Sequence, residues 1–262
     1  MINCSLIICF HAARFDNLLQ TLKFLSNYHK DILIMSELVT ICQNSIEFEN
    51  NNLLTEFKNL TQPFQTHKHF DLEIDEMKLA YMTNFGVSHA SSQKICVLES
   101  DRILPAGYFE QVFEQLKPNV SITCRNMKKL KSPATNEQIK NNEFEYNDEQ
   151  RSEENNIGVR NMWSGNTAFW KQDFLDAEMM DEGYVGYGWA DSDMTNKMKE
   201  IGVKNIFRDE IELHLWHPPQ TYGKSDQKAL FIQNGIRYCR KWRIEYPDWF
   251  KEEIFKHRKI MI

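Results

Sequence analysis

The chain has 262 residues, of which 42% are hydrophobic and 26% are charged, with a mean hydropathy of −0.56. This composition is typical of a globular protein and excludes a disordered, collagen-like or coiled-coil chain. A net charge of −6 argues against a nucleic acid partner, and no apolar run approaches the ~20 residues of a membrane span. The length fits one large domain or two small ones.

The N-terminus and the cysteines favour a reducing, cytoplasmic location. Residues 2–10 are apolar, but no basic region precedes them and no small-residue cleavage site follows, so we expect no secretory signal. None of the six cysteines forms a CxxC pair, and Cys4, Cys9, Cys96 and Cys124 stand in apolar runs, where cysteine acts as a small hydrophobe. We therefore expect neither a zinc site nor a disulfide framework.

The first hundred residues alternate between apolar runs and segments with helical spacing. The runs predict strands at 4–10, at either 32–34 or 38–42, and at 94–98. Between them, the spacing predicts helices at 17–27, 53–60 and 73–89. This β-α-β-α-β order predicts a mostly parallel sheet with helices on both faces, in which ligands bind at the carboxyl ends of strands. His11 and Arg14 follow one such end, and Glu99 and Asp101 follow another.

The second half is less regular. A helix is predicted at 105–116 and a strand at 120–124, followed by the polar stretch 128–160, which predicts either a solvated loop or a mobile lid. The end of the chain has helical spacing and carries ten Lys or Arg against five Asp or Glu between residues 224 and 262. It is expected either to pack as helices or to dock on an anionic membrane or a partner enzyme.

Two short segments carry groups suited to binding a phosphorylated ligand. Glu99 and Asp101 are two apart in an extended segment, so both point the same way, and paired carboxylates suit Mg²⁺ or Mn²⁺ with a diphosphate. They could equally cap a helix or face solvent. Gly165 and Asn166 stand in a tight polar turn that allows close approach of a ligand to the backbone, or that is an ordinary turn.

Two further segments suit catalysis and metal binding. Residues 181–194 combine three glycines and three aromatics with Asp191 and Asp193. Sugar faces stack on such rings, and Asp191 could act as general base for a hydroxyl, although it could also merely cap a helix. His214 and His217 follow a short alternating strand at 211–213. One of them together with Asp101 would favour Mn²⁺ over Mg²⁺.

In this order the segments resemble the nucleotide-sugar glycosyltransferases of the GT-A fold. The likeness is to the family 2-like bacterial inverting enzymes and to the galactosyltransferase and polypeptide N-acetylgalactosaminyltransferase branches. Residues 98–105 stand where that family has Asp-x-Asp, 164–169 resemble its Gly-Gly-Asn-x-x-Phe segment, and 186–194 resemble its Trp-Gly-x-Glu-Asp segment. Three residues depart from the family pattern: Glu99 replaces Asp, Ala190 replaces an acceptor-binding Glu, and Lys197 replaces Arg.

The resemblance implies a metal-dependent inverting enzyme that moves a sugar from a nucleotide-sugar, a UDP-sugar in first place, to a glycan or other hydroxyl acceptor. Asp191 would be the catalytic base, and Mn²⁺ (or Mg²⁺) would bind Asp101 with His214 or its rival His217. The residues expected to border the nucleotide are Phe10, His11, Arg14, Asn84 and Glu99. Those expected at the donor sugar and acceptor are Trp163, Gly165, Asn166, Tyr187, Trp189 and Asp193, the last orienting the loop rather than reacting.

The implied architecture is an α/β, GT-A (Rossmann-like) chain with a mixed, mostly parallel sheet flanked by helices and a helical C-terminal tail. One domain would span 1–222, with a nucleotide-binding half at 1–101, an acceptor half at 102–222 and an extension at 223–262. The protein would be cytoplasmic, soluble or peripherally attached to a membrane through that extension. Glu99 and Ala190 also fit a catalytically impaired saccharide-binding module, and a retaining glycosyltransferase stays open because some share the Gly-Trp-Asp segment.

Overall fold

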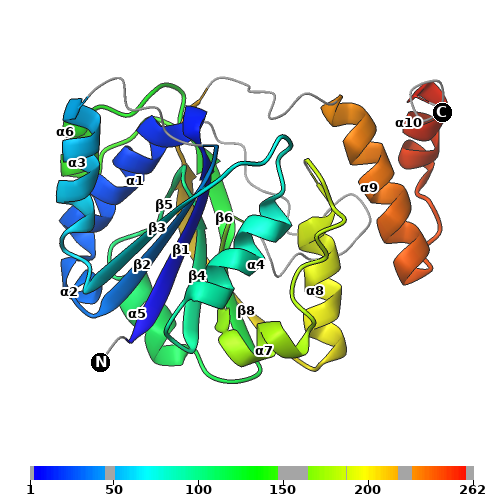
Figure 1. Ribbon diagram of the computed structural model, residues 1–262, viewed down its shortest axis with the longest axis horizontal. Helices are drawn as coiled ribbons and strands as arrows, with labels where there is room; N and C mark the ends of the chain where they lie inside the picture. Colours follow the sequence, from blue (N-terminus) through cyan, green and yellow to red (C-terminus); the bar gives the residue numbers. More distant parts are fainter. Residues whose placement is uncertain (1–2, 45–50, 147–164, 187, 218–225, 258–262) are drawn as a thin grey trace.

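The computed structural model describes residues 3–44, 51–146, 165–186, 188–217 and 226–257. Within them, one eight-stranded sheet runs in the order β3-β2-β1-β4-β7-β6-β8-β5, with helices on both faces and α9 and α10 at one end (Figure 1). The strands are β1 (Cys4–His11), β2 (Ser36–Gln43), β3 (Thr66–Leu72), β4 (Lys94–Glu99), β5 (Arg102–Ile103), β6 (Val120–Lys129), β7 (Asn166–Trp170) and β8 (Lys204–His214).

The helices connect these strands and extend the chain past them. They are the short 3₁₀ turn η1 (Ala12–Arg14), α1 (Phe15–Tyr28), α2 (Lys30–Leu33), α3 (Asn51–Thr61), α4 (Leu79–His89), α5 (Tyr108–Gln115), α6 (Asn136–Asn141), α7 (Lys171–Asp176), α8 (Ala190–Glu200), α9 (Gln227–Trp242) and α10 (Asp248–His257). None of the helices in the described ranges is long and apolar enough to cross a lipid bilayer.

The first half of the sheet is parallel, as the sequence predicted. β1 pairs with β2 on one side and with β4 on the other, and Cys9 lies opposite Glu99. Of the two positions predicted for the second strand, the one at 38–42 is correct and lies inside β2. Residues 32–34 instead form the end of the short helix α2 and the start of the turn after it. β3 was missed, because its residues are half-exposed and polar. The helix predicted at 73–89 begins only at Leu79.

The second half makes the sheet mixed. β7 pairs antiparallel with both β4 and β6, and β8 runs parallel to β6 and antiparallel to the short β5. The register of the last pair sets Arg102 opposite His214 and Ile103 opposite Leu213. The predicted mixed, mostly parallel sheet flanked by helices is therefore confirmed.

The core consists of two apolar layers, one on each face of the sheet. Successive residues of β1 enter opposite layers: Leu6 and Ile8 pack toward α1, α3 and α5, whereas Ile7 packs toward α4, α7 and α8. β1 lies at the centre of the parallel half and is covered on both faces, which explains why its sequence is continuously apolar. The sheet is thus a rigid base from which strand ends present their side chains.

A third apolar cluster joins the C-terminal helices to the rest of the fold. It is built mainly by aromatic side chains, among them Trp189 before α8, Tyr238 of α9 and Phe250 of α10. Basic residues of these helices form ion pairs with neighbouring carboxylates, among them Lys228 with Glu253, Arg237 with Asp181 and Lys241 with Asp193. The predicted helical tail is therefore packed against the molecule rather than projecting from it.

Candidate active site

A cluster of one carboxylate and two imidazoles lies at the carboxyl end of the sheet. The Nε2 atoms of His214 and His217 are 3.5 and 3.4 Å from the same Oδ2 of Asp101. Potential ligand atoms of all three residues lie within 4.8 Å of one another. The pairing of β5 with β8 produces this arrangement, since it holds His214 beside the segment that carries Asp101. Both histidines lie close to Asp101, so the two alternative metal ligands predicted from the sequence are brought to the same place.

The protonation states of this cluster suit a divalent cation. Burial, followed by the positive charge of Arg102, lowers the pKa of His214 to about 3, so its imidazole is neutral. A neutral imidazole is the form that binds metal. Burial raises the pKa of Asp101 to about 6, against the opposing effect of Arg102. The Oδ1 atom of Asp101 is buried and accepts no hydrogen bond from the described residues, which is a position that a cation would satisfy.

Arg102 is a hub between the carboxylates of the site. It is buried, and its Nε and Nη2 atoms donate to Oε2 of Glu99 at 2.8 and 2.5 Å. The same guanidinium lies 3.5 Å from Asp101 and 3.7 Å from Glu212. Sequence reasoning missed both Arg102 and Glu212. The signals that could have found them were an arginine directly after the acidic pair and a glutamate two residues before His214 on the same strand.

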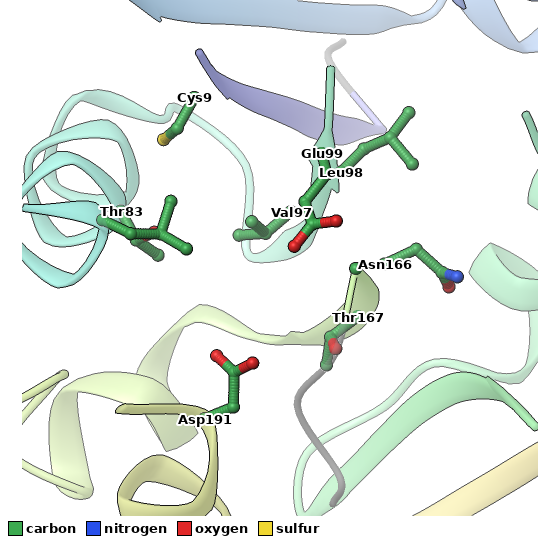
Figure 2. A pocket seen from close by; sticks show the side chains of 10 residues that line it. Cys9, Thr83, Val97, Leu98, Glu99, Asn166, Thr167 and Asp191 are labelled. Atoms are coloured by element: carbon green, nitrogen blue, oxygen red, sulfur yellow. The ribbon is translucent and has the colours of Figure 1, made fainter. Parts of the chain in front are cut away.

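A pocket of about 350 Å³, part of it open to solvent, adjoins this hub. Its polar lining includes Glu99, Gly165, Asn166 and Asp191, and its remaining walls are Cys9, Leu79, Thr83, Val97, Leu98 and Thr167. Figure 2 shows the carboxylates of Glu99 and Asp191 facing the same space from opposite sides. Three segments that are far apart in the sequence therefore meet around one cavity.

The turn that begins β7 fixes one wall of the pocket. The backbone N–H of Glu99 donates to the carbonyl of Gly165 at 2.8 Å. Gly165 has a φ of +60°, and a Cβ there would lie 3.1 Å from the Arg102 guanidinium, so both the backbone conformation and the close approach favour glycine. The side chain of Asn166 turns to the protein, where it accepts from the Tyr108 hydroxyl at 2.9 Å and donates to Glu212.

The two aspartates at the start of α8 have different surroundings. Asp191 is partly exposed, lines the pocket and stands in the first helical turn, where the helix dipole favours a carboxylate. Asp193 is fully buried and accepts from Nε1 of Trp242 at 2.7 Å and from Lys241 at 2.8 Å. Asp191 therefore faces the cavity, whereas Asp193 fastens α8 to α9.

Three more residues expected at the ligand lie elsewhere. Phe10 is 2% exposed and its ring packs between Phe15 and His69. Asn84 is buried and exchanges hydrogen bonds with the backbone of Met180. Trp189 is 9% exposed and belongs to the aromatic cluster of the C-terminal helices.

One expected nucleotide neighbour, Arg14, stands at the site, and two expected ligand-lining residues lie outside the described part of the chain. Nη1 of Arg14 is 3.6 Å from Oδ2 of Asp101, whereas His11 is the partly exposed last residue of β1. Trp163 and Tyr187 lie outside the described residues. The part of the predicted site that the structure assembles is therefore Arg14, Glu99, Asp101, Gly165, Asn166, Asp191, His214 and His217.

No protein-family model matches the sequence, and no curated protein matches it. Solved structures do. The crystal structure of GalNAc-T7 with UDP, GalNAc and Mn²⁺ aligns with a TM-score of 0.65 and 16% identity over 95% of this chain. The mannosyltransferase PcManGT from Pyrobaculum calidifontis, in complex with GDP-Man and Mn²⁺, aligns with a TM-score of 0.57 and 13% identity over 94% of this chain. This chain has the GT-A fold. The match to S. aureus TarS 1-349, with a TM-score of 0.56 and 11% identity over 91% of the chain, agrees with it.

The GT-A likeness concerns the fold and not the whole of each matched protein. The chain covers 50% of the GalNAc-T7 chain, 65% of the PcManGT chain and 64% of the TarS chain. The fold implied by the sequence resemblance is thereby confirmed.

Proposed function

We propose that the chain is a metal-dependent inverting glycosyltransferase that transfers a sugar from a nucleotide-sugar, a UDP-sugar in first place, to a hydroxyl of a glycan or other acceptor. One observation carries the proposal: Arg102 links the Asp101–His214–His217 cluster to the Asp191 pocket, because its guanidinium bonds to Glu99 in the pocket wall and lies 3.5 Å from Asp101. Glu99, which Arg102 links to the candidate metal ligands, and the candidate base Asp191 thus face the same cavity. Two proteins with the same fold were solved with a nucleotide or nucleotide-sugar and Mn²⁺.

Asp101, His214 and His217 would hold the cation. When bound, Mn²⁺ neutralises the two phosphates of the donor and stabilises the diphosphate as it leaves. The mixed carboxylate and imidazole donors support Mn²⁺ over Mg²⁺, because Mg²⁺ prefers oxygen ligands. Arg14 adds positive charge beside Asp101, on the side where the nucleotide would lie.

Asp191 would carry out the chemical step. Its carboxylate would accept the proton of the acceptor hydroxyl as that oxygen attacks the anomeric carbon of the donor sugar. The bond between that carbon and the diphosphate would break as the new bond forms on the opposite face, so the configuration would invert. Glu99 is held by Arg102 and would therefore bind ribose or a metal-bound water rather than react.

The division into a nucleotide-binding half (1–101) and an acceptor half (102–222) is part of the proposal. Its support is that strands of both halves pair in one sheet, which favours a single domain with a helical extension at 223–262. No observation supports membrane contact by that extension. Several of its basic residues form ion pairs with carboxylates of the protein itself. The cytoplasmic location stays a prediction.

The test is a turnover screen with UDP-glucose, UDP-galactose, their N-acetyl forms and GDP-mannose, each with Mn²⁺ and with a chelator. We expect Mn²⁺-dependent release of the nucleotide from at least one donor. Proton NMR of the first-formed sugar then decides the stereochemistry, with the inverted anomer expected. The retained anomer would favour a retaining enzyme, and tight binding of a donor without turnover would favour the saccharide-binding module.

A further inference from the structure

α9 contacts the loop that leads into Asp191. The side chain of Asn234 is buried in the middle of α9, and its Nδ2 donates to the carbonyls of Val185 at 2.8 Å and Gly188 at 3.4 Å. Its Oδ1 accepts from the backbone N–H of Val185 at 3.4 Å. One amide side chain therefore holds the loop backbone at two points, although 43 residues separate it in sequence from Asp191.

The contact between loop and helix leaves no room for extra atoms. A Cβ on Gly188 would lie 2.7 Å from the ring of Phe231, and one on Gly186 would lie 2.9 Å from Leu230. From the opposite side, a Cβ on Gly235 would lie 2.8 Å from the indole of Trp189. Since real Cβ atoms do not approach other atoms this closely, the glycines on both sides permit the contact. Figure 1 shows α9 standing beside α8 and the loop before it.

Trp189, two residues before Asp191, is held in an unfavourable backbone conformation. Trp189 has a φ of +73°, the left-handed region that bulky residues avoid, and it stands at the N-cap of α8. Its ring is buried against Phe231, Tyr238 and Phe250 of the C-terminal helices. Such a conformation persists only where the surroundings enforce it. The packing of α9 and α10 supplies that enforcement, and the bonds of Lys241 and Trp242 to Asp193 supply a second anchor.

We propose that α9 sets the position of Asp191 and that Asn234 is the positioning residue. The inference rests on the proposed function of Asp191 as the base. The candidate metal ligands lie at the end of β8, just after it, and on the segment between β4 and β5, whereas the hydrogen bonds of Asn234 described above go to the loop before α8. Removing the amide should therefore displace the base without affecting nucleotide binding. A misplacement of about 1 Å at a reacting group can slow a reaction by about a hundredfold.

The test compares Asn234→Ala with Asn196→Ala. Asn196 is a matched control, because its Nδ2 donates across the same α8–α9 interface to the Tyr238 hydroxyl at 2.8 Å without touching the loop. We expect Asn234→Ala to lower kcat on the best UDP-sugar by at least about tenfold with an unchanged Kd for UDP and Mn²⁺. Hydrogen exchange of the Val185 amide should rise in that variant. Asn196→Ala should keep both kcat and that exchange rate.

Gly235→Ala provides a second route to the same answer. It removes no hydrogen bond and favours helix, yet its methyl would clash with Phe250 and with Trp189, which pack against each other, so kcat should fall without loss of helix content. Equal kcat losses in Asn234→Ala and Asn196→Ala, or unchanged loop exchange in Asn234→Ala, would overturn the inference. A wild-type protein that turns over no donor would overturn the proposed function instead, so the two failures are read from different measurements.

Discussion

The two sides of the site are held in place by different parts of the fold. On the binding side, strand pairing fixes the cluster: β5 against β8 sets Arg102 opposite His214, and Asp101 precedes β5 directly. On the catalytic side, Asp191 follows a glycine-rich loop whose conformation depends on Asn234 and the C-terminal aromatic cluster. The difference teaches that binding and chemistry should be separable by mutation. Changes near α9 should affect turnover, and changes in the sheet should affect metal binding or stability.

The largest effect is expected on the catalytic side. Asp191→Asn keeps the size of the side chain but removes the base, so turnover should fall by about 10²–10⁴-fold while UDP still binds. The measurement is steady-state turnover with Mn²⁺ and the donor found in the screen. Asp176→Asn on the exposed side of α7 is the matched control. A loss of less than about threefold would contradict the role assigned to Asp191, since a base contributes far more than that.

The second-largest effect is expected at Arg102, the hub between the two sides, and it concerns stability. Arg102→Met would leave the carboxylates of Glu99, Asp101 and Glu212 without the guanidinium that pairs with them. Removing one partner from a buried ionic group costs about 3–5 kcal/mol, so the free energy of unfolding in urea should fall by that amount. Arg240→Met, at an exposed position on α9, should change it little. If the two variants unfold alike, the hub is not the stabilising element described above.

The contributions of His214 and His217 to metal binding can be measured separately. Since loss of even an outer partner of a metal ligand lowers metal affinity by about 10- to 100-fold, His214→Ala and His217→Ala should each weaken Mn²⁺ binding by at least the lower figure. Calorimetric titration of Mn²⁺ in the presence of UDP measures this, with His257→Ala on α10 as control. A variant with unchanged affinity would remove that histidine from the ligand set. Unchanged affinity in both would contradict the metal site.

The smallest effect is expected in the parallel half of the sheet, far from chemistry. The carboxylate of Glu37 is fully buried and accepts from Ser5 Oγ at 2.6 Å, from Ser91 N at 2.6 Å and from Ser91 Oγ at 2.9 Å, with Lys68 at 2.7 Å. Burial alone would raise the pKa of Glu37, but Lys68, Ser5 and Ser91 together lower it below its usual value. Its ionised form therefore stabilises the folded state, and Glu37→Gln should lose about 1–3 kcal/mol at pH 7.

The pH dependence gives the sign of this contribution. Because the folded protein holds the proton of Glu37 less tightly than the unfolded chain, the stabilisation is present above the ordinary pKa of 4.5 and is lost as the pH falls through the lower folded value. Urea unfolding of wild type and Glu37→Gln should therefore converge in acid. Glu56→Gln, which alters only the surface pair with Lys23, is the control. A gap that widens in acid would contradict the assignment.

The sequence could predict what is encoded locally. The apolar runs of β1 and β4 identified the parallel sheet, and the ends of those strands identified Glu99 and Asp101. β3 escaped because an exposed edge strand needs no apolar run, and its residues His67, Lys68 and Asp71 are polar. Histidines three apart suggested two of the three candidate metal ligands, but only the folded structure shows that both lie within 3.5 Å of Asp101.

What failed depends on distant contacts. Trp189 stands in a loop of glycines and aromatics that suggests a sugar platform, yet its side chain is buried against α9 and α10. Phe10 and Asn84 likewise serve the interior. No local pattern distinguishes an aromatic that faces a ligand from one that faces a helix some 40 residues later, because both need flat apolar surface. Arg102 escaped for a different reason, since its role depends on Glu99 and Glu212 being brought together by the fold.

The measurement that tests the central claim most directly is a calorimetric titration of UDP into wild type, Asp101→Asn and Asp191→Asn, each with Mn²⁺ and with chelator. The geometry predicts Mn²⁺-dependent binding to wild type and Asp191→Asn, and none to Asp101→Asn or to any protein in chelator. Binding that is equal in all three proteins and indifferent to the metal, or no binding of UDP to wild type at all, would contradict the assignment of this site to a nucleotide-sugar.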